Sequence, residues 1–297
     1  MDLKVKIGNK IFKNPVFVAS GTFGYGEEFS KLFNIEKLGA IITKGITLNP
    51  RDGFDGIRLA ETPAGIINRI GLQNVGLKAF IKEKMKFLSL LDTGIIVNIA
   101  GETIEEYKII VEELDKIKRI DAIEINVSCP NVEKGGIEFS EDEKILKNLL
   151  KTLRQLTRKA LIIKLSPSAG NLIILSILAE KMGIDGITIN NTFKGVVIDT
   201  ESQQLKIRGG LSGPAIFPIA LNNVMEVSKK IDIPVMGCGG IYNSDVALQF
   251  FLAGATAIQI GTFNFVQPDI GPQIIDGIEN YLKKHNLKSI YQIIGRC

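Results

Sequence analysis

Short apolar runs recur along the chain with polar, helix-like stretches between them, and this alternation predicts its architecture. The runs are apolar on both faces and rich in Ile, Val and Ala, which is typical of buried parallel strands. Apolar residues at spacings of three and four, as in 104–117 and 145–156, predict amphipathic helices between them. The expected strands are 16–19, 40–43, 95–99, 122–127, 161–165, 186–189, 234–236 and 257–260.

Strands that alternate with helices in this number predict an α/β fold, a (β/α)8 TIM barrel, although alternation alone leaves a doubly wound sheet open. Three segments depart from the repeat. Segment 4–12, with Gly8-Asn9 at its centre, predicts an N-terminal hairpin that closes the barrel bottom. Segments 44–74 and 193–213 are long insertions after the second and sixth strands, and such insertions are usually lids or partner surfaces. Because no Gly/Ser-rich or Pro-rich linker interrupts residues 1–297, we expect a single domain.

Two of the expected helices follow a capping signal. Thr103 precedes Glu106 by three residues, and Ser140 precedes Glu143 by three. This spacing is that of a capping box, so helices are expected to begin just after Thr103 and Ser140.

Composition narrows the function classes. Lys and Arg number 36 against 32 Asp and Glu, a net charge of +4, and the basic residues are interleaved with acids, which argues against nucleic-acid binding. Cys129, Cys238 and Cys297 are far apart and form no C-x-x-C, so no structural zinc or iron–sulfur site is expected in this chain. Unpaired thiols, no signal-peptide pattern and apolar runs too short for a bilayer predict a cytoplasmic protein without a membrane segment.

Polar residues collect where the expected strands end, and in a barrel these ends form the active site. Neutral amides, two lysines and one thiol converge there without a carboxylate or histidine, since the single histidine, His285, lies in a lysine-rich terminal helix. This argues against a hydrolase triad, a metal site or a two-carboxylate glycosidase, and suits a large polar anionic ligand. The residues are Ser20, Lys44, Gly45, Asn98, Asn126, Cys129, Lys164, Asn190, Asn191, Thr192, Gly239, Gly240, Gly261 and Thr262.

Each of these features also has a structural explanation. Glycines at the last two strand ends let backbone N–H groups approach a phosphate, but they also make tight turns. A strand-end lysine needs an anion or reaches water at the rim, and Lys164 could also be the Schiff-base nucleophile of an aldolase. Cys129, flanked by amides, favours a functional thiol over a packing one, whereas Cys238 is expected to be structural. Asn68 and Asn74, in the over-long loop after Lys44, are expected to contact ligand rather than only to form turns.

Nearly the whole chain resembles the flavin-dependent dihydroorotate dehydrogenases. The segments that carry the resemblance, in order and at strand ends, are 19–24 (ASGTFG), 43–45 (TKG), 71–74 (GLQN), 126–131 (NVSCPN), 164–167 (KLSP), 210–214 (GLSGP) and 261–262 (GT). Cysteine at 129 is similar to the soluble class, since the membrane-linked class has serine there. Lys134-Gly135-Gly136 is similar to the NAD-linked type, whose catalytic subunit works with an electron-transfer subunit.

The resemblance implies a barrel that holds one FMN and oxidises dihydroorotate to orotate in pyrimidine biosynthesis. Cys129 would take the C5 proton while a hydride passes to FMN N5. The implied cofactor-binding residues are Ser20, Lys44, Gly45, Asn98, Asn126, Lys164, Asn190, Gly213, Gly239, Gly240, Gly261 and Thr262. The implied substrate-binding residues are Lys44, Asn68, Arg69, Ile70, Gly71, Leu72, Asn126, Asn191 and Thr192.

The resemblance also implies partners. The chain lacks a Rossmann glycine fingerprint and cluster cysteines, so electrons would reach NAD through a partner subunit with FAD and a [2Fe-2S] cluster. A homodimer is expected, and the fumarate-linked type is the alternative within the family. Two positions depart from the family pattern. Arg69 stands where a small residue is commoner, and Asn190 adds a second amide directly before Asn191. Both bear on the position of the substrate loop.

Overall fold

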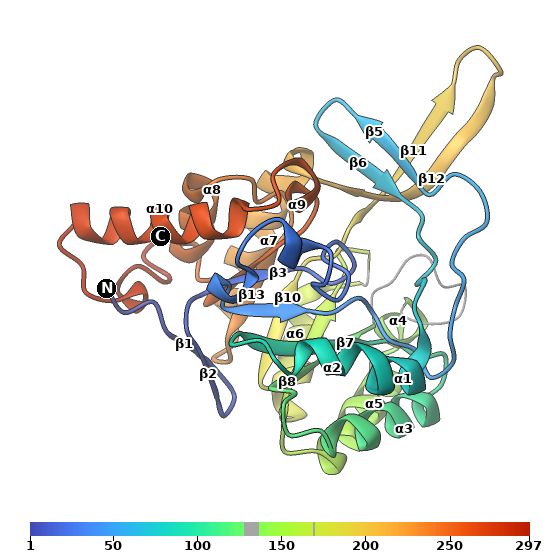
Figure 1. Cartoon of the computed structure of the whole chain (residues 1–297), viewed down its shortest axis with the longest axis horizontal. Coiled ribbons are helices and arrows are strands. Elements are labelled where there is room, and N and C mark those ends of the chain that lie inside the picture. Colours follow the sequence, from blue (N-terminus) through green and yellow to red (C-terminus); the bar gives the residue numbers. More distant parts are fainter. Residues whose placement is uncertain (128–136, 169) are drawn as a thin grey trace.

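The computed structural model describes residues 1–127, 137–168 and 170–297. Its parallel strands form a closed barrel in the order β10-β13-β14-β3-β4-β7-β8-β9, which decides for the TIM barrel and against the open doubly wound sheet (Figure 1). All the strands predicted from the apolar runs are present, with ends shifted by one or two residues at most. They are β3 (Val16–Val18), β4 (Ala40–Ile42), β7 (Gly94–Ile99), β8 (Ala122–Asn126), β9 (Ala160–Leu165), β10 (Gly186–Ile189), β13 (Val235–Cys238) and β14 (Ala257–Ile260).

Helices between the strands cover the outside of the barrel (Figure 1). None of the helices in the described ranges is long and apolar enough to cross a membrane. The α-helices of the described ranges are α1 (Gly76–Ala79), α2 (Met85–Leu88), α3 (Ile104–Asp115), α4 (Ile137–Glu141), α5 (Glu143–Leu156), α6 (Leu172–Lys181), α7 (Phe217–Ser228), α8 (Ser244–Leu252), α9 (Phe263–Val266) and α10 (Ile270–Lys284). A π-helical turn (Phe80–Lys84) joins α1 to α2, and short 3₁₀ turns lie at Phe29–Lys31, Ile35–Lys37, Pro214–Ile216 and Ile290–Gln292.

The two capping signals had different outcomes. Thr103 caps α3 as predicted, since its side chain accepts a hydrogen bond from the N–H of Glu106. The prediction for Ser140 was wrong, because Ser140 lies inside α4 and the next helix starts after Asp142. The Asp142 carboxylate accepts from the N–H groups of Lys144 and Ile145, and therefore caps α5 instead.

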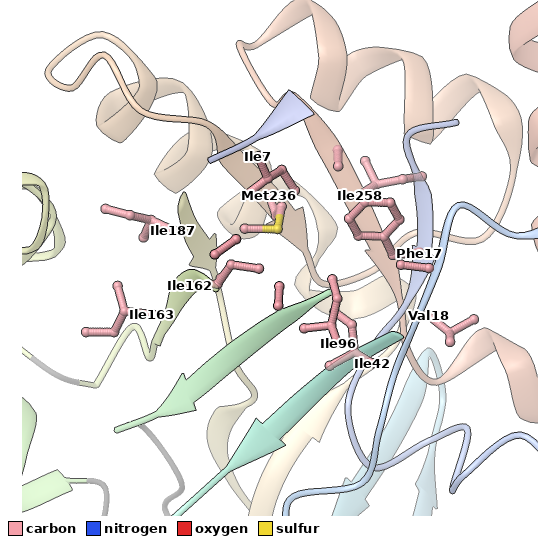
Figure 2. Packing of buried hydrophobic residues seen from close by; sticks show 14 of the residues in the cluster. Ile7, Phe17, Val18, Ile42, Ile96, Ile162, Ile163, Ile187, Met236 and Ile258 are labelled. Carbon is pink, nitrogen blue, oxygen red and sulfur yellow. The ribbon is translucent and has the colours of Figure 1, made fainter. Parts of the chain in front are cut away.

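The predicted N-terminal hairpin closes the bottom of the barrel. Strands β1 (Val5–Ile7) and β2 (Lys10–Phe12) pair antiparallel around Gly8-Asn9. Ile7 and Met236 lie beside each other at the first residue of β10, Gly186, where a Cβ would come within 3.0 Å of Ile7 and 3.2 Å of Met236. Figure 2 shows these two side chains among the apolar residues that fill this end of the barrel. The described residues therefore close this end of the barrel, and a ligand site is expected at the other end.

The two long insertions form one structure. Strands β5 (Leu59–Thr62) and β6 (Gly65–Asn68) of the first insertion pair with β11 (Phe193–Asp199) and β12 (Gln204–Ser212) of the second, in the order β11-β12-β6-β5. We call this four-stranded antiparallel sheet the arm. It extends away from the barrel (Figure 1) and has a separate small apolar cluster of Ala60, Ile67 and Ile207.

Candidate active site

A cavity of about 260 Å³ lies at the carboxyl ends of the barrel strands and under the arm. Most of the residues predicted from strand ends and from the substrate loop line it. These are Ser20, Lys44, Gly45, Asn68, Ile70, Leu72, Asn98, Asn126, Lys164, Asn191, Thr192, Gly239, Gly261 and Thr262. The rest of the wall comprises Ala19, Gly21, Thr22, Leu59, Ile66, Gln73, Ser212, Ile216, Cys238 and Phe265, so apolar side chains of the arm face amides and lysines of the barrel.

Five predicted residues do not line this cavity. Asn190 is fully buried and its side-chain oxygen accepts from Asn223 of α7 at 2.8 Å. The exposed Arg69 places its guanidinium 3.7 Å from the ring centroid of Phe54. The three glycines have positive φ and pack against backbone: Gly71 against Gly53 and Phe54, Gly213 against Gly65, and Gly240 against Phe217.

The predicted base, Cys129, lies outside the described residues, as do its neighbours from Ser128 to Gly136.

Lys164 is the most buried cation of the cavity, with 3% of the residue exposed. It comes from β9, where the register pairs it with Asn126 of β8. Its ammonium lies 3.4 Å from the hydroxyl of Ser20, 3.5 Å from the side-chain oxygen of Gln259 and 4.0 Å from the sulfur of Cys238. These contacts are long and none is an ion pair, so an acceptor in the cavity can bind the ammonium in place of one of them.

Asn98 provides the complementary group. Its side-chain nitrogen donates to Glu124 at 2.7 Å, while its side-chain oxygen is buried without a hydrogen-bond partner in the part of the chain described. Gly45 makes room for that oxygen, because a Cβ at this position would lie 2.9 Å from it. A buried acceptor that stays unpaired lowers the stability of the protein by about 1–3 kcal/mol. We therefore expect this oxygen to accept a hydrogen bond from an N–H group of a ligand in the cavity.

Lys44 is the second cation, half buried just after β4 and held by a backbone hydrogen bond to Gly24. Burial lowers the pKa of Lys44, and the nearby Arg58 cation lowers it further, while Glu28 opposes both. Within the described ranges its ammonium forms no ion pair. An anionic ligand would therefore be drawn to this side of the cavity.

The loop after Lys44 is fixed by its own amides. Asn68 donates from its side chain to the carbonyl of Gly210 on β12 at 3.0 Å, and so joins the two insertions at the cavity wall. Asn74 differs from the expectation of ligand contact. It is buried, its oxygen accepts from the N–H groups of Thr47 and Gly76, and its nitrogen donates to Thr47 and Leu72. Asn74 thus uses its amide to hold the loop, away from the cavity.

The sequence reasoning missed three residues. Cys238, expected to be structural, lines the cavity beside Lys164, and burial raises the pKa of its thiol although Lys164 acts to lower it. Glu124 and Gln259 lie one layer below the cavity and are fully buried. The signal was available for Glu124, because residues two apart on a strand face the same side and Asn126 faces the cavity.

Comparison with known proteins shows the family of the chain. The family model for dihydroorotate dehydrogenase matches residues 2–282. The catalytic subunits of dihydroorotate dehydrogenase B (NAD(+)) from Petrotoga mobilis and Geotalea daltonii are 47% and 46% identical to the chain, over 99% of its length and 99% and 97% of theirs. A crystal structure of DHODH in complex with ferulenol from Eimeria tenella has the same fold, with a TM-score of 0.83 at 21% identity over 99% of this chain and 88% of that one. The chain therefore belongs to the dihydroorotate dehydrogenase family of oxidoreductases.

Proposed function

We propose that this chain oxidises dihydroorotate to orotate in pyrimidine biosynthesis, with one FMN in the barrel mouth. The observation that carries the proposal is the pairing, in one cavity, of a buried lysine with long hydrogen-bond contacts and a buried amide oxygen with no partner among the described residues. The family model and the names of the relatives support the choice of substrate.

The residues fit FMN. An isoalloxazine ring has carbonyl oxygens that the ammonium of Lys164 can bind and one imide N–H that the free oxygen of Asn98 can accept. Gly239, with φ of 124°, and Gly261 open the backbone at the ends of β13 and β14, where a phosphate can approach N–H groups; Thr262 adds a hydroxyl. When bound, FMN supplies the two-electron acceptor that none of these side chains provides.

The other polar residues would hold the substrate. Lys44 would bind the carboxylate of dihydroorotate, which is the only charged group of that molecule. The side chains of Asn68, Asn126 and Asn191 and the hydroxyl of Thr192 offer donors and acceptors for the amide edges of its ring. The apolar residues Leu59 and Ile66 of the arm would exclude water, so that orientation supplies much of the acceleration.

Cys129 is proposed as the base that removes the C5 proton, on the resemblance of the segment around it. It is tested by Cys129→Ala and Cys129→Ser in the purified flavoprotein. Both variants should retain flavin, and dihydroorotate should bleach the Ala variant at least ~100-fold more slowly than the wild type. Bleaching at the normal rate would exclude Cys129 as the base.

Electrons are proposed to reach NAD through a partner subunit with FAD and a [2Fe-2S] cluster, joined to a homodimer of this chain. The relatives' names support this, since they contain both "catalytic subunit" and "NAD(+)". The purified chain alone should then reduce an artificial dye but not NAD. Rapid turnover with fumarate alone would favour the fumarate-linked type instead.

An absorbance spectrum tests the whole proposal. The protein as purified should be yellow, and dihydroorotate without oxygen should bleach it. A colourless protein, trapped as a covalent adduct with its substrate on Lys164 by borohydride, would favour the Schiff-base aldolase, which a buried lysine also suits.

A further inference from the structure

One fully buried carboxylate, Glu124, lies beneath the cavity and accepts three hydrogen bonds. The side-chain nitrogen of Asn98 donates to one of its oxygens at 2.7 Å. The hydroxyl of Thr188 and the side-chain nitrogen of Gln259 donate to the other, each at 2.7 Å. Gln259 also donates to Thr188 at 2.8 Å, so Glu124, Thr188 and Gln259 form a ring of hydrogen bonds.

The barrel register explains this convergence. Parallel pairing places Asn98 of β7 beside Glu124 of β8, and Thr188 of β10 beside Lys164 of β9. Gln259 of β14 is paired with Cys238 of β13 in the same way. Side chains of neighbouring strands at one level share one face, so these residues form a polar layer between the apolar interior and the cavity.

A carboxylate accepts hydrogen bonds and does not donate them, so each amide that faces Glu124 must turn its NH₂ toward it. The oxygen of each amide is then forced to point the other way. For Asn98 this is the oxygen without a partner among the described residues, beside Gly45 at the cavity wall. For Gln259 it is the oxygen 3.5 Å from the ammonium of Lys164.

We infer that Glu124 is a positioning residue that sets the hydrogen-bonding polarity of the cofactor pocket, by locking Asn98 as an acceptor toward the cavity and Gln259 as an acceptor toward Lys164. The inference rests on the proposed flavin site. The pocket then accepts a flat ring that presents an N–H to Asn98 and carbonyl oxygens to Lys164. Glu124 touches neither ligand and acts only through these amides.

Glu124→Gln tests this with almost no change in shape. A glutamine offers one NH₂ where the carboxylate had an acceptor, so Asn98 or Gln259 must reverse or leave two donors facing each other. Thr188→Val is the matched control, because it removes a donor to Glu124 but leaves both amides held by the carboxylate. Glu124→Met, which has similar length and no strong hydrogen-bonding group, is the second variant, and it leaves neither amide held.

The readouts are the Kd of the apoprotein for FMN and the solvent exchange of the imide N–H in ¹⁵N-labelled FMN. In the wild type and in Thr188→Val this proton should be protected from exchange, because it is bound to a buried acceptor. In Glu124→Met, which holds neither amide, protection should be lost, and in both Glu124 variants the Kd should rise about tenfold to a hundredfold. A purely packing role would weaken binding in Thr188→Val as well and would leave the proton protected in each variant.

The outcomes separate this inference from the proposed function. Failure of the wild-type apoprotein to bind FMN would overturn both. Tight FMN binding with an unprotected imide proton in the wild type would overturn only the role of Glu124, whatever the variants do. Protection that persists in a folded Glu124→Met protein would do the same.

Discussion

The side-chain amide of Asn68 donates a 3.0 Å hydrogen bond to the carbonyl of Gly210, although 142 residues separate the two in the chain. A side chain at position 210 would collide with Thr192, because a Cβ there would come 2.0 Å from the threonine hydroxyl oxygen. Two proposed substrate residues, Asn68 and Thr192, therefore meet at this one glycine.

Gly210→Ala should raise the KM for dihydroorotate by about tenfold or more, because the new methyl must push Thr192 or β12 away from the cavity. FMN content should stay unchanged, since the barrel residues are not touched. Gly195→Ala is the control in the same sheet, where the nearest atom is the movable end of Ile67 at 3.1 Å. Steady-state kinetics of both variants check the prediction, and an unchanged KM in Gly210→Ala would contradict it.

Lys164→Met should slow the bleaching of bound flavin by dihydroorotate at least ~100-fold, since it removes the positive charge proposed to bind the ring carbonyl oxygens. The apoprotein should not lose stability, because a buried ammonium with long contacts is replaced by an apolar chain of similar volume. Stopped-flow absorbance and thermal melts measure the two effects. Lys118→Met, at an exposed site, should change neither.

The pKa of Lys44, lowered chiefly by burial, predicts an alkaline limit to substrate binding. As pH rises through this lowered pKa, the ammonium loses its proton and the KM for the dihydroorotate anion should rise, at a lower pH than for an ordinary lysine. Over the same window the unfolded chain binds more protons than the folded one, so the contribution of Lys44 to stability increases with pH.

Glu28→Gln makes this prediction sharper. Glu28 raises the pKa of Lys44, so its neutralisation should move the rise in KM to still lower pH. Glu201→Gln, at an exposed position in the turn of the arm, should leave the profile where it is. A shift in the opposite direction would show that Lys44 does not control this limit.

Asp142→Ala should destabilise the protein by about 1 kcal/mol, because α5 loses the carboxylate that accepts from Lys144 and Ile145. Asp142→Asn should retain most of the stability, since an amide oxygen caps a helix about as well. Urea unfolding of the two variants measures the difference. Equal losses would indicate that charge rather than capping matters at this position.

The barrel could be predicted because the local pattern of apolar residues determines where its strands lie. Each strand is buried on both faces, as an apolar run such as 186–189 indicates, and that run matches β10 at both ends. The joining of the two insertions into one sheet could not be predicted, because β6 and β12 pair across more than a hundred residues and neither segment carries a signal for the other. The capping box at Ser140 failed for a local reason, because Asp142 two residues later offers a stronger acceptor.

Much of the cavity wall could also be predicted, since the ends of barrel strands converge whatever their sequence. Lys44, Asn98 and Lys164 were found in this way, and they line the cavity. Asn190 was expected in the same place, yet its side chain turns to α7, because the direction of a single residue after a strand is set by local backbone geometry. Glu124 escaped notice because a glutamate between two isoleucines suggests an exposed edge until closure of the barrel buries it.

The separate cluster of Ala60, Ile67 and Ile207 has a dynamic consequence. So few apolar contacts give the arm little free energy of its own, far less than the continuous core gives the barrel. Its amides should therefore exchange with deuterium through local opening while those of β8 and β9 remain protected. Such opening would move the cavity wall formed by Leu59 and Ile66 while the barrel side of the cavity stays in place, and we expect exchange of ligand to follow the rate of this local opening.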